Sequence, residues 1–262
     1  MNTFPIEGDQ LPEDCNGWLL FLDEFNSADR AVQKAAYKLI LDRMVGEHKL
    51  HDQVAIICAG NLETDNAIVE EMSTALQSRL VHIELTVDPD IWTDWAAENG
   101  IDHRIISFIK FKPGNLYSFK PNHTDRTYAS PRTWEFANRI IEEMGTDDPL
   151  IQTVLSGTIS ESVAREFIGF TKIYTKLPTI NEIVKSGKTL KVPDEPSILY
   201  ALTGSISHYA KSSNIKELME FVNRLPMEFQ VVCLRQIVRR DPALLKSDAI
   251  TSWITTNSTE LF

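Results

Sequence analysis

Residues 18–24 read Trp18-Leu19-Leu20-Phe21-Leu22-Asp23-Glu24, in which five large apolar side chains are followed directly by two carboxylates. An uninterrupted apolar run of this length predicts a strand that is buried on both faces, as in a parallel sheet covered by helices. In open α/β sheets, ligands bind beyond the carboxyl ends of such strands, which is where Asp23 and Glu24 fall. A strand that ends in a solvated acidic turn is the plainer alternative, because carboxylates usually lie at the surface.

The composition is that of an ordinary globular protein, and its negative net charge disfavours some classes of binding partner. Acidic residues outnumber basic ones by 37 to 26, which gives a formal net charge of −11. This charge argues against a broad surface for nucleic acid or anionic membranes, although local basic sites remain open. Three scattered cysteines provide no disulfide framework and favour a cytoplasmic location. No apolar run is long enough to span a membrane.

A helix and a short polar connection are expected after the acidic residues. Ser27 is a good N-cap, and the apolar spacing that follows predicts a helix to about Val45. Gly46 fits the position at which such a helix ends. The polar residues 47–53 are interpreted as a connection that could form a small hairpin.

Two more strands are expected in the first third of the chain. The apolar run Val54–Ala59 predicts a second buried strand, and a helix is expected after it to about Ser78. Residues 80–85 alternate apolar and polar side chains, which predicts a third strand with one polar face. Strands that alternate with helices over so short a stretch predict an α/β layer with parallel pairing.

The remainder of the chain is expected to be helical. Ser130 at an N-cap and Pro131 at the first helical position predict the start of one helix especially clearly. The expected helices cover residues 89–98, 102–110 and 130–144, with six or seven short helices between about 149 and 257.

Four short motifs along the chain resemble motifs of known nucleotide-binding proteins. Leu20–Glu24 resembles a Walker B strand, and Ala59–Asn61 resembles the end of a sensor-1 strand. Gln77–Arg79 resembles an arginine-finger segment, and Ser130–Arg132 resembles the sensor-2 motif that opens a lid helix. In this order and spacing the chain resembles the AAA+ ATPases, most closely the MoxR-like branch, over essentially its whole length.

The resemblance implies ATP and Mg²⁺ as cofactors and a role for each motif residue. Asp23 would hold the Mg²⁺ of MgATP through water, and Glu24 would orient the attacking water. Asn61 would hydrogen-bond that water or the γ-phosphate. Arg79 would reach into a neighbouring subunit's site as the arginine finger, and Arg132 would contact the phosphates from the lid.

Structural alternatives stand beside three of these roles. Asn61 is also a common turn residue at a strand end. Arg79 follows a predicted helix, where a cation gains about 0.3–1 kcal/mol from the helix dipole. Arg132 falls in the first turn of a helix, where a cation is unfavourable unless an anion binds to the exposed amides.

A Walker A motif is missing. Ser186–Thr189 contains Gly-Lys-Thr, but the P-loop pattern requires a glycine at position 182, which is Glu182. Gly187 is better explained as the stop of a helix over residues 180–185. Only 22 residues precede Asp23, fewer than the roughly 30 of a βαβ unit.

We therefore expect the chain to be about the C-terminal two-thirds of a MoxR-like AAA+ ATPase. A truncated gene, an internal start, an excised fragment and a subunit that naturally lacks the P-loop all remain open. The expected domains are a partial AAA+ α/β domain, lid helices and a helical C-terminal region, at residues 1–87, 88–145 and 146–262.

Three functions are compatible with this organisation. The first is ATP-driven remodelling of a partner protein, possibly one with a von Willebrand A-type domain, by a hexamer-type ring. The second is a regulatory or scaffold subunit of such a ring that does not hydrolyse ATP. The third is a DNA-acting AAA+ protein, which the net charge and the lack of basic clusters disfavour.

Overall fold

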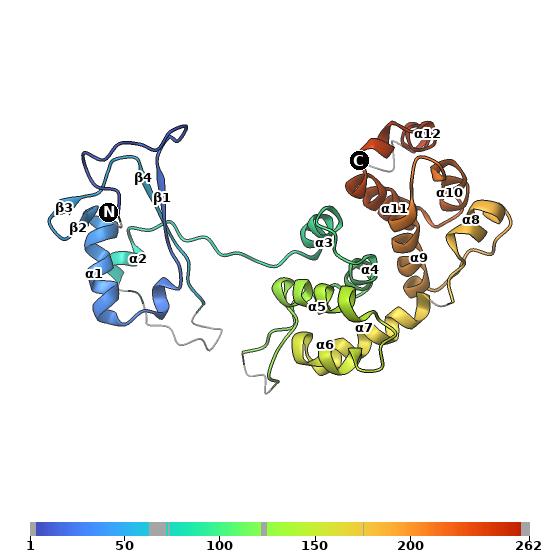
Figure 1. Ribbon diagram of the computed structural model, residues 1–262, viewed down its shortest axis with the longest axis horizontal. Coiled ribbons are helices and arrows are strands. Elements are labelled where there is room, and N and C mark those ends of the chain that lie inside the picture. Colours follow the sequence, from blue (N-terminus) through green and yellow to red (C-terminus); the bar gives the residue numbers. More distant parts are fainter. Residues whose placement is uncertain (1–3, 63–71, 73, 122–124, 175, 258–262) are drawn as a thin grey trace. The chain divides into compact units, whose positions relative to one another are not determined.

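The computed structural model describes residues 4–62, 72, 74–121, 125–174 and 176–257. The chain divides into two compact units, residues 1–85 with 120–123 and residues 86–119 with 124–262 (Figure 1). The fold is mixed α/β and mostly helical, with a small parallel sheet in the first unit. Each unit is described below by itself.

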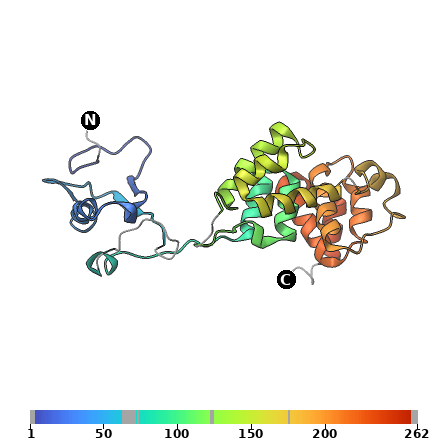
Figure 2. The ribbon, with the colours of Figure 1, turned by 90° about the horizontal axis from the view of Figure 1, so that it is seen from below.

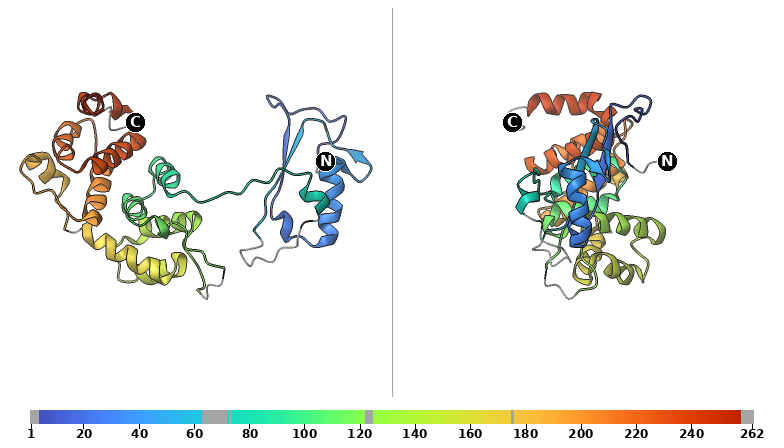
Figure 3. Two further views of the ribbon diagram at one scale, coloured as in Figure 1. Left: turned by 180° about the vertical axis from the view of Figure 1, so that it is seen from behind. Right: turned by 90° about the vertical axis from the view of Figure 1, so that its left-hand side faces the viewer.

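The first unit is built on a parallel pair of strands. β1 (Trp18–Leu22) pairs with β4 (Val54–Cys58), so that Trp18 lies opposite Val54 and Leu22 opposite Cys58. Both strands and their parallel pairing confirm the predictions from the two apolar runs. The helix α1 (Arg30–Leu41) lies beside the strands (Figure 3).

The start of α1 differs from the prediction. Its N-cap is Asp29, and Ser27 belongs instead to a preceding 3-10 turn, η1 (Phe25–Ser27). The expected cap at Ser27 is therefore wrong by two residues. The reason is tertiary, because the backbone N–H of Phe25 donates to the carbonyl of Ala59 at 2.8 Å and holds this turn against the end of β4.

Helix α1 also ends earlier than predicted, and a short hairpin follows it. The helix stops at Leu41, and β2 (Met44–Val45) then pairs antiparallel with β3 (His48–Lys49). Gly46 has a φ of +62° in the turn of this hairpin, a conformation that glycine adopts without steric cost. Gly46 is thus a hairpin residue, and the prediction that it ends a helix is wrong.

The described residues cover only one face of the sheet. Side chains of one face pack with Leu39 and Leu50, and include Trp18, Leu20, Leu22, Val54 and Ile56. On the other face Leu19, Phe21 and Ile57 are 63%, 54% and 51% exposed. The expectation of burial on both faces is therefore wrong for the described residues, because helix α1 covers one side and no described element covers the other.

The third expected strand is absent. Residues 81–88 form no regular structure, and Val81, Ile83 and Leu85 are 90%, 79% and 92% exposed. Alternation alone is not sufficient, because a strand needs a neighbour that takes up its backbone hydrogen bonds. The helix expected before this segment is described only as α2 (Thr74–Gln77), since residues 63–71 and 73 lie outside the described part.

The second unit is helical, as predicted, and its helices pack side by side (Figure 2). One core is formed mainly by α3 to α7 and the other by α8 to α12, and α9 contributes Ala201 to the first and Leu202 to the second. The elements are α3 (Pro89–Glu98), α4 (His103–Phe111), η3 (Pro113–Asn115), α5 (Pro131–Met144), α6 (Ile151–Ile159), α7 (Glu161–Tyr174), α8 (Ile180–Ser186), α9 (Pro196–Tyr209), α10 (Ile215–Val222), α11 (Met227–Arg240), η4 (Pro242–Lys246) and α12 (Asp248–Thr256).

The region around Gly187 confirms that Ser186–Thr189 is not a P-loop. Helix α8 precedes it, whereas a P-loop follows a strand. Gly187 has a φ of −55°, and a Cβ at this position would lie 2.6 Å from the carbonyl oxygen of Ile183 and 3.1 Å from Cβ of Phe221. Glycine is therefore required here by close packing rather than by a left-handed backbone.

Two stacked histidines join α4 to α9. The rings of His103 and His208 lie 4.4 Å apart at an interplanar angle of 19°. Nδ1 of His208 is buried and has no hydrogen-bond partner among the described residues. Burial, with smaller contributions from His103 and Arg240, lowers the pKa of His208 to about 4.

This arrangement predicts a specific loss of stability in acid. Because the pKa of His208 is lower in the folded chain than its ordinary value of 6.5, the unfolded chain binds more protons between these two pH values. The contribution of neutral His208 is complete above pH about 6.5 and decreases as the pH falls towards 4. The variant His208→Gln should lose less stability over this interval than the unmutated chain in chemical denaturation series.

Ile206→Val provides the control, because it removes a buried methylene group of the same helix and no ionisable group. It should lower the stability by the same amount at each pH. Parallel pH profiles for His208→Gln and the unmutated chain would contradict the prediction.

Candidate functional site

The ends of β1 and β4 bring two of the predicted motifs together. Because the strands are parallel and Leu22 lies opposite Cys58, the residues that follow both strands leave the sheet at the same edge. The backbone N–H of Ala59 donates to the carbonyl of Leu22 at 2.9 Å, and this bond extends the ladder beyond the strands. The acidic turn after β1 therefore lies beside the segment that leads to Asn61.

The acidic turn has an unusual backbone. Glu24 has φ 50° and ψ 36°, in the left-handed region, which costs a residue other than glycine on the order of 1–3 kcal/mol. Oδ1 of Asp23 accepts the backbone N–H of Glu24 at 3.0 Å, and the carbonyl of Glu24 accepts the N–H of Ser27 at 2.9 Å. These bonds hold the turn, and both carboxylates remain exposed.

Asn26 connects this turn to the segment after β4. Its side chain is 9% exposed. Nδ2 donates to the carbonyl of Asn61 at 2.7 Å, and Oδ1 accepts the backbone N–H of Asn61 at 3.1 Å. The sequence indicated no special role for Asn26, since asparagine is common in turns for purely local reasons.

Gly60 makes room for this contact. A Cβ at position 60 would lie 2.1 Å from Oδ1 and 2.7 Å from Cγ of Asn26. The φ of Gly60 is not positive, so the requirement for glycine comes from the neighbouring amide and not from the backbone. A glycine directly before a polar strand-end residue is the one sequence signal that could have suggested a close approach here.

The donor set at this edge suits a hydrated magnesium ion. The described residues contain no group of three or more His, Cys, Asp or Glu side chains that could enclose a metal. Mg²⁺ usually keeps several waters and takes one or two carboxylates together with substrate phosphates. Asp23 and Glu24, both exposed beyond the end of β1, are the carboxylates at this edge that could hold such an ion.

Arg79 lies in the same unit, just beyond α2. Its Nη1 donates to the carbonyl of Ala75 at 2.6 Å, and its backbone N–H donates to the carbonyl of Leu76 at 3.0 Å. These are the contacts of a cation that caps a helix end. The side chain is also exposed, so a neighbouring molecule could contact it.

Arg132 lies in the second unit, and only its surroundings within that unit are described. Ser130 and Thr133 form a capping box at the start of α5, as the sequence predicted for the cap. Arg132 is exposed in the first turn of this helix. The candidate site therefore consists of Asp23, Glu24 and Asn61 at the edge of the sheet. The contact between Arg132 and the phosphates stays a prediction.

The comparisons leave the family open. No family model matches the chain, and no curated protein or solved structure was found that matches it. The function is therefore argued from the residues of the site.

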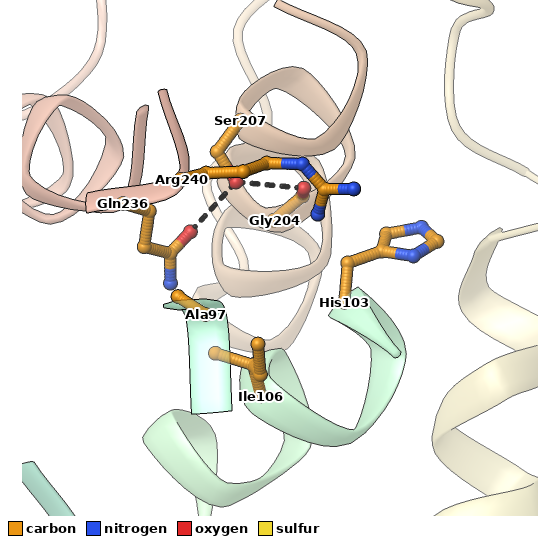
Figure 4. Close-up of a pocket in the computed structure, with 7 residues that line it drawn as sticks. All are labelled: Ala97, His103, Ile106, Gly204, Ser207, Gln236 and Arg240. Carbon is orange, nitrogen blue, oxygen red and sulfur yellow. Dashed lines mark hydrogen bonds between the residues drawn. The ribbon is translucent and has the colours of Figure 1, made fainter. Parts of the chain in front are cut away.

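One small hollow among the described helices of the second unit is too small for a nucleotide. It is lined by seven residues of α3, α4, α9 and α11, among them His103, Ser207 and Gln236 (Figure 4). The hydroxyl of Ser207 is within bonding distance of Oε1 of Gln236 at 3.0 Å and of the carbonyl of Gly204 at 2.9 Å. A cavity of about 10 Å³ holds about one water molecule.

In the described residues, no helix is long and apolar enough to cross a membrane.

Proposed function

We propose that the chain supplies the metal-binding and water-activating residues of an AAA+ ATPase site of the MoxR-like type. The observation that supports this most is the placement of Asp23, Glu24 and Asn61 at one edge of two parallel strands in register. A site of this kind would couple ATP hydrolysis to the remodelling of a partner protein.

Each residue has a defined task in this proposal. The carboxylate of Asp23 would hold Mg²⁺ through its waters, and the ion would supply positive charge to the phosphates of ATP. The carboxylate of Glu24 orients the attacking water and polarises it towards the γ-phosphorus. The side chain of Asn61 donates a hydrogen bond to the γ-phosphate or accepts one from that water.

The residues that bind the β- and γ-phosphates of ATP must belong to another chain or segment. No Walker A pattern occurs in the 262 residues, so they lack the backbone cradle and the lysine that hold the β- and γ-phosphates. We therefore propose that the chain functions with subunits or segments that carry a P-loop, in a hexamer-type ring. The partner would be another protein, possibly with a von Willebrand A-type domain.

Exposed apolar side chains support an assembly. Leu19, Phe21 and Ile57 lie on the open sheet face, and Val81 and Leu85 are almost fully exposed. Phe21 and Ile57 are paired across the two strands, and an exposed apolar group of this kind usually marks an interaction surface. Cys15, Cys58 and Cys233 are free thiols, which supports a reducing, cytoplasmic location.

The proposal predicts how the chain behaves with ATP. The chain alone should show no tight, Mg²⁺-dependent ATP binding in isothermal titration, because Asp23 and Glu24 cannot replace a P-loop. In mixed assemblies with subunits that carry a Walker A motif, Glu24→Gln should abolish the hydrolysis that the unmutated chain supports. Tight binding by the chain alone, or full activity of Glu24→Gln, would overturn the proposal.

A non-hydrolysing scaffold subunit is the second candidate, favoured by the missing Walker A motif. In that case Glu24→Gln would leave mixed assemblies fully active, whereas Arg79→Ala would still inactivate the neighbouring site. A DNA-acting protein remains disfavoured by the net charge of −11, and a salt-dependent gel shift with DNA would be needed to support it.

A further inference from the structure

We infer that Asn26 is a positioning residue, whose buried side-chain amide holds Asn61 at a set place relative to Asp23 and Glu24. The inference rests on the proposed function, because Asn61 needs positioning only if it acts on the same ligand as the two carboxylates. It adds to that proposal a residue that contacts neither metal nor phosphate.

The geometry supports positioning because the contact is double. A single hydrogen bond would leave the segment after β4 free to rotate about it. The amide of Asn26 instead donates to the carbonyl of Asn61 and accepts from the N–H of the same residue, at 2.7 and 3.1 Å. Two antiparallel bonds from one planar group fix both the distance and the orientation of the Asn61 backbone.

The amide is itself held on both sides. Asn26 belongs to η1, which is tied to β4 through the bond from the N–H of Phe25 to the carbonyl of Ala59. On the other side Gly60 lies directly against the amide, where even a methyl group would collide with Oδ1. The side chain is nearly buried, so water competes little for its two hydrogen bonds.

The position of Glu24 depends on the same turn. Its left-handed backbone is closed by the bond from the N–H of Ser27 to its carbonyl, and Asn26 lies between these two residues. Asn26 therefore links the turn that carries the carboxylates to the segment that carries Asn61. Catalytic groups must be held within a fraction of an ångström of their working geometry, and this amide supplies such a link.

The test uses Mn²⁺ as a paramagnetic probe of the full chain, because Mn²⁺ occupies oxygen sites of the Mg²⁺ type. In the unmutated chain, Mn²⁺ should broaden the NMR signals of Asp23, Glu24 and the side-chain amide of Asn61. In Asn26→Ala the broadening should persist at Asp23 and Glu24 and decrease at Asn61. Exchange of the Asn61 backbone N–H should accelerate on the order of 2- to 12-fold, as expected for the loss of one net hydrogen bond.

Two further variants separate positioning from simple destabilisation. Gly60→Ala should reproduce the loss of broadening at Asn61 by displacing the amide, and should add nothing in the Asn26→Ala background. Gln33→Ala removes another buried amide of this unit, whose Nε2 donates to the carbonyl of Ala28 at 3.1 Å and does not contact Asn61. This control should leave the broadening at Asn61 unchanged.

The possible failures are distinguishable. If Mn²⁺ broadens neither Asp23 nor Glu24 in the unmutated chain, the metal role in the proposed function is wrong and the positioning role fails with it. If both are broadened but Asn26→Ala leaves Asn61 as it was, only the positioning role is wrong. Strong additivity of Gly60→Ala and Asn26→Ala would also overturn it.

Discussion

Arg79→Ala is expected to reduce ATP hydrolysis by about 10³- to 10⁵-fold in mixed assemblies with Walker A-bearing subunits. In the proposed function the guanidinium acts in trans on charge that develops in the transition state, and no other group replaces it. Turnover of the mixed assemblies is the quantity to measure, at equal subunit ratios.

Arg79→Lys separates this role from the helix cap. The guanidinium of Arg79 donates to the carbonyl of Ala75 in the isolated chain, and a lysine ammonium would keep a cation at the same helix end. Lysine cannot offer the planar, bidentate donor pair of arginine to a phosphate. If Arg79 is an arginine finger, both variants lose activity, whereas Arg79→Lys regains it if the residue only caps α2.

Trp134→Ala is expected to lower the free energy of unfolding of the helical unit by about 3–5 kcal/mol. Trp134 is fully buried, its ring centroid lies 5.5 Å from that of Phe167, and its Nε1 donates to the carbonyl of Asn115 at 2.9 Å. Alanine would leave a large cavity and would remove the donor to the carbonyl of Asn115. Both changes lower the free energy of unfolding.

Phe136, two residues later on the same helix, is the matched control. It is 45% exposed, so Phe136→Ala removes less buried surface and should cost much less than Trp134→Ala. Urea denaturation followed by far-ultraviolet circular dichroism measures both variants, because the helices of this unit dominate the signal. Equal losses for the two variants would show that the core around α5 is not packed as described.

Sequence patterns predicted the elements whose signals are local. The apolar runs of β1 and β4 predict strands because an unbroken run of large apolar side chains with polar residues at its end is a local signal. Helix α5 was recognised from Ser130 and Pro131, since an N-cap acts within one helical turn. The edge that holds Asp23, Glu24 and Asn61 followed from parallel pairing alone.

Features that depend on contacts between distant residues could not be predicted in this way. Residues 80–85 carry a strand pattern, but a strand exists only where a neighbour accepts its hydrogen bonds, and no described strand does so. Gly46 satisfied a helix-stop pattern and a hairpin turn equally well, and the pairing of β2 with β3 decided between them. The number of covered sheet faces likewise depends on which elements pack against the sheet.

The sequence by itself determined which polar residues follow the two strands, because carboxylates after an apolar run are visible in the order of residue types. Only the tertiary structure decided how those residues are held. The amide of Asn26 meets the backbone of Asn61 across 35 residues of sequence, and only because β1 and β4 lie side by side in register. Gly60 is needed for the same reason, since the atom it must avoid belongs to a distant part of the chain.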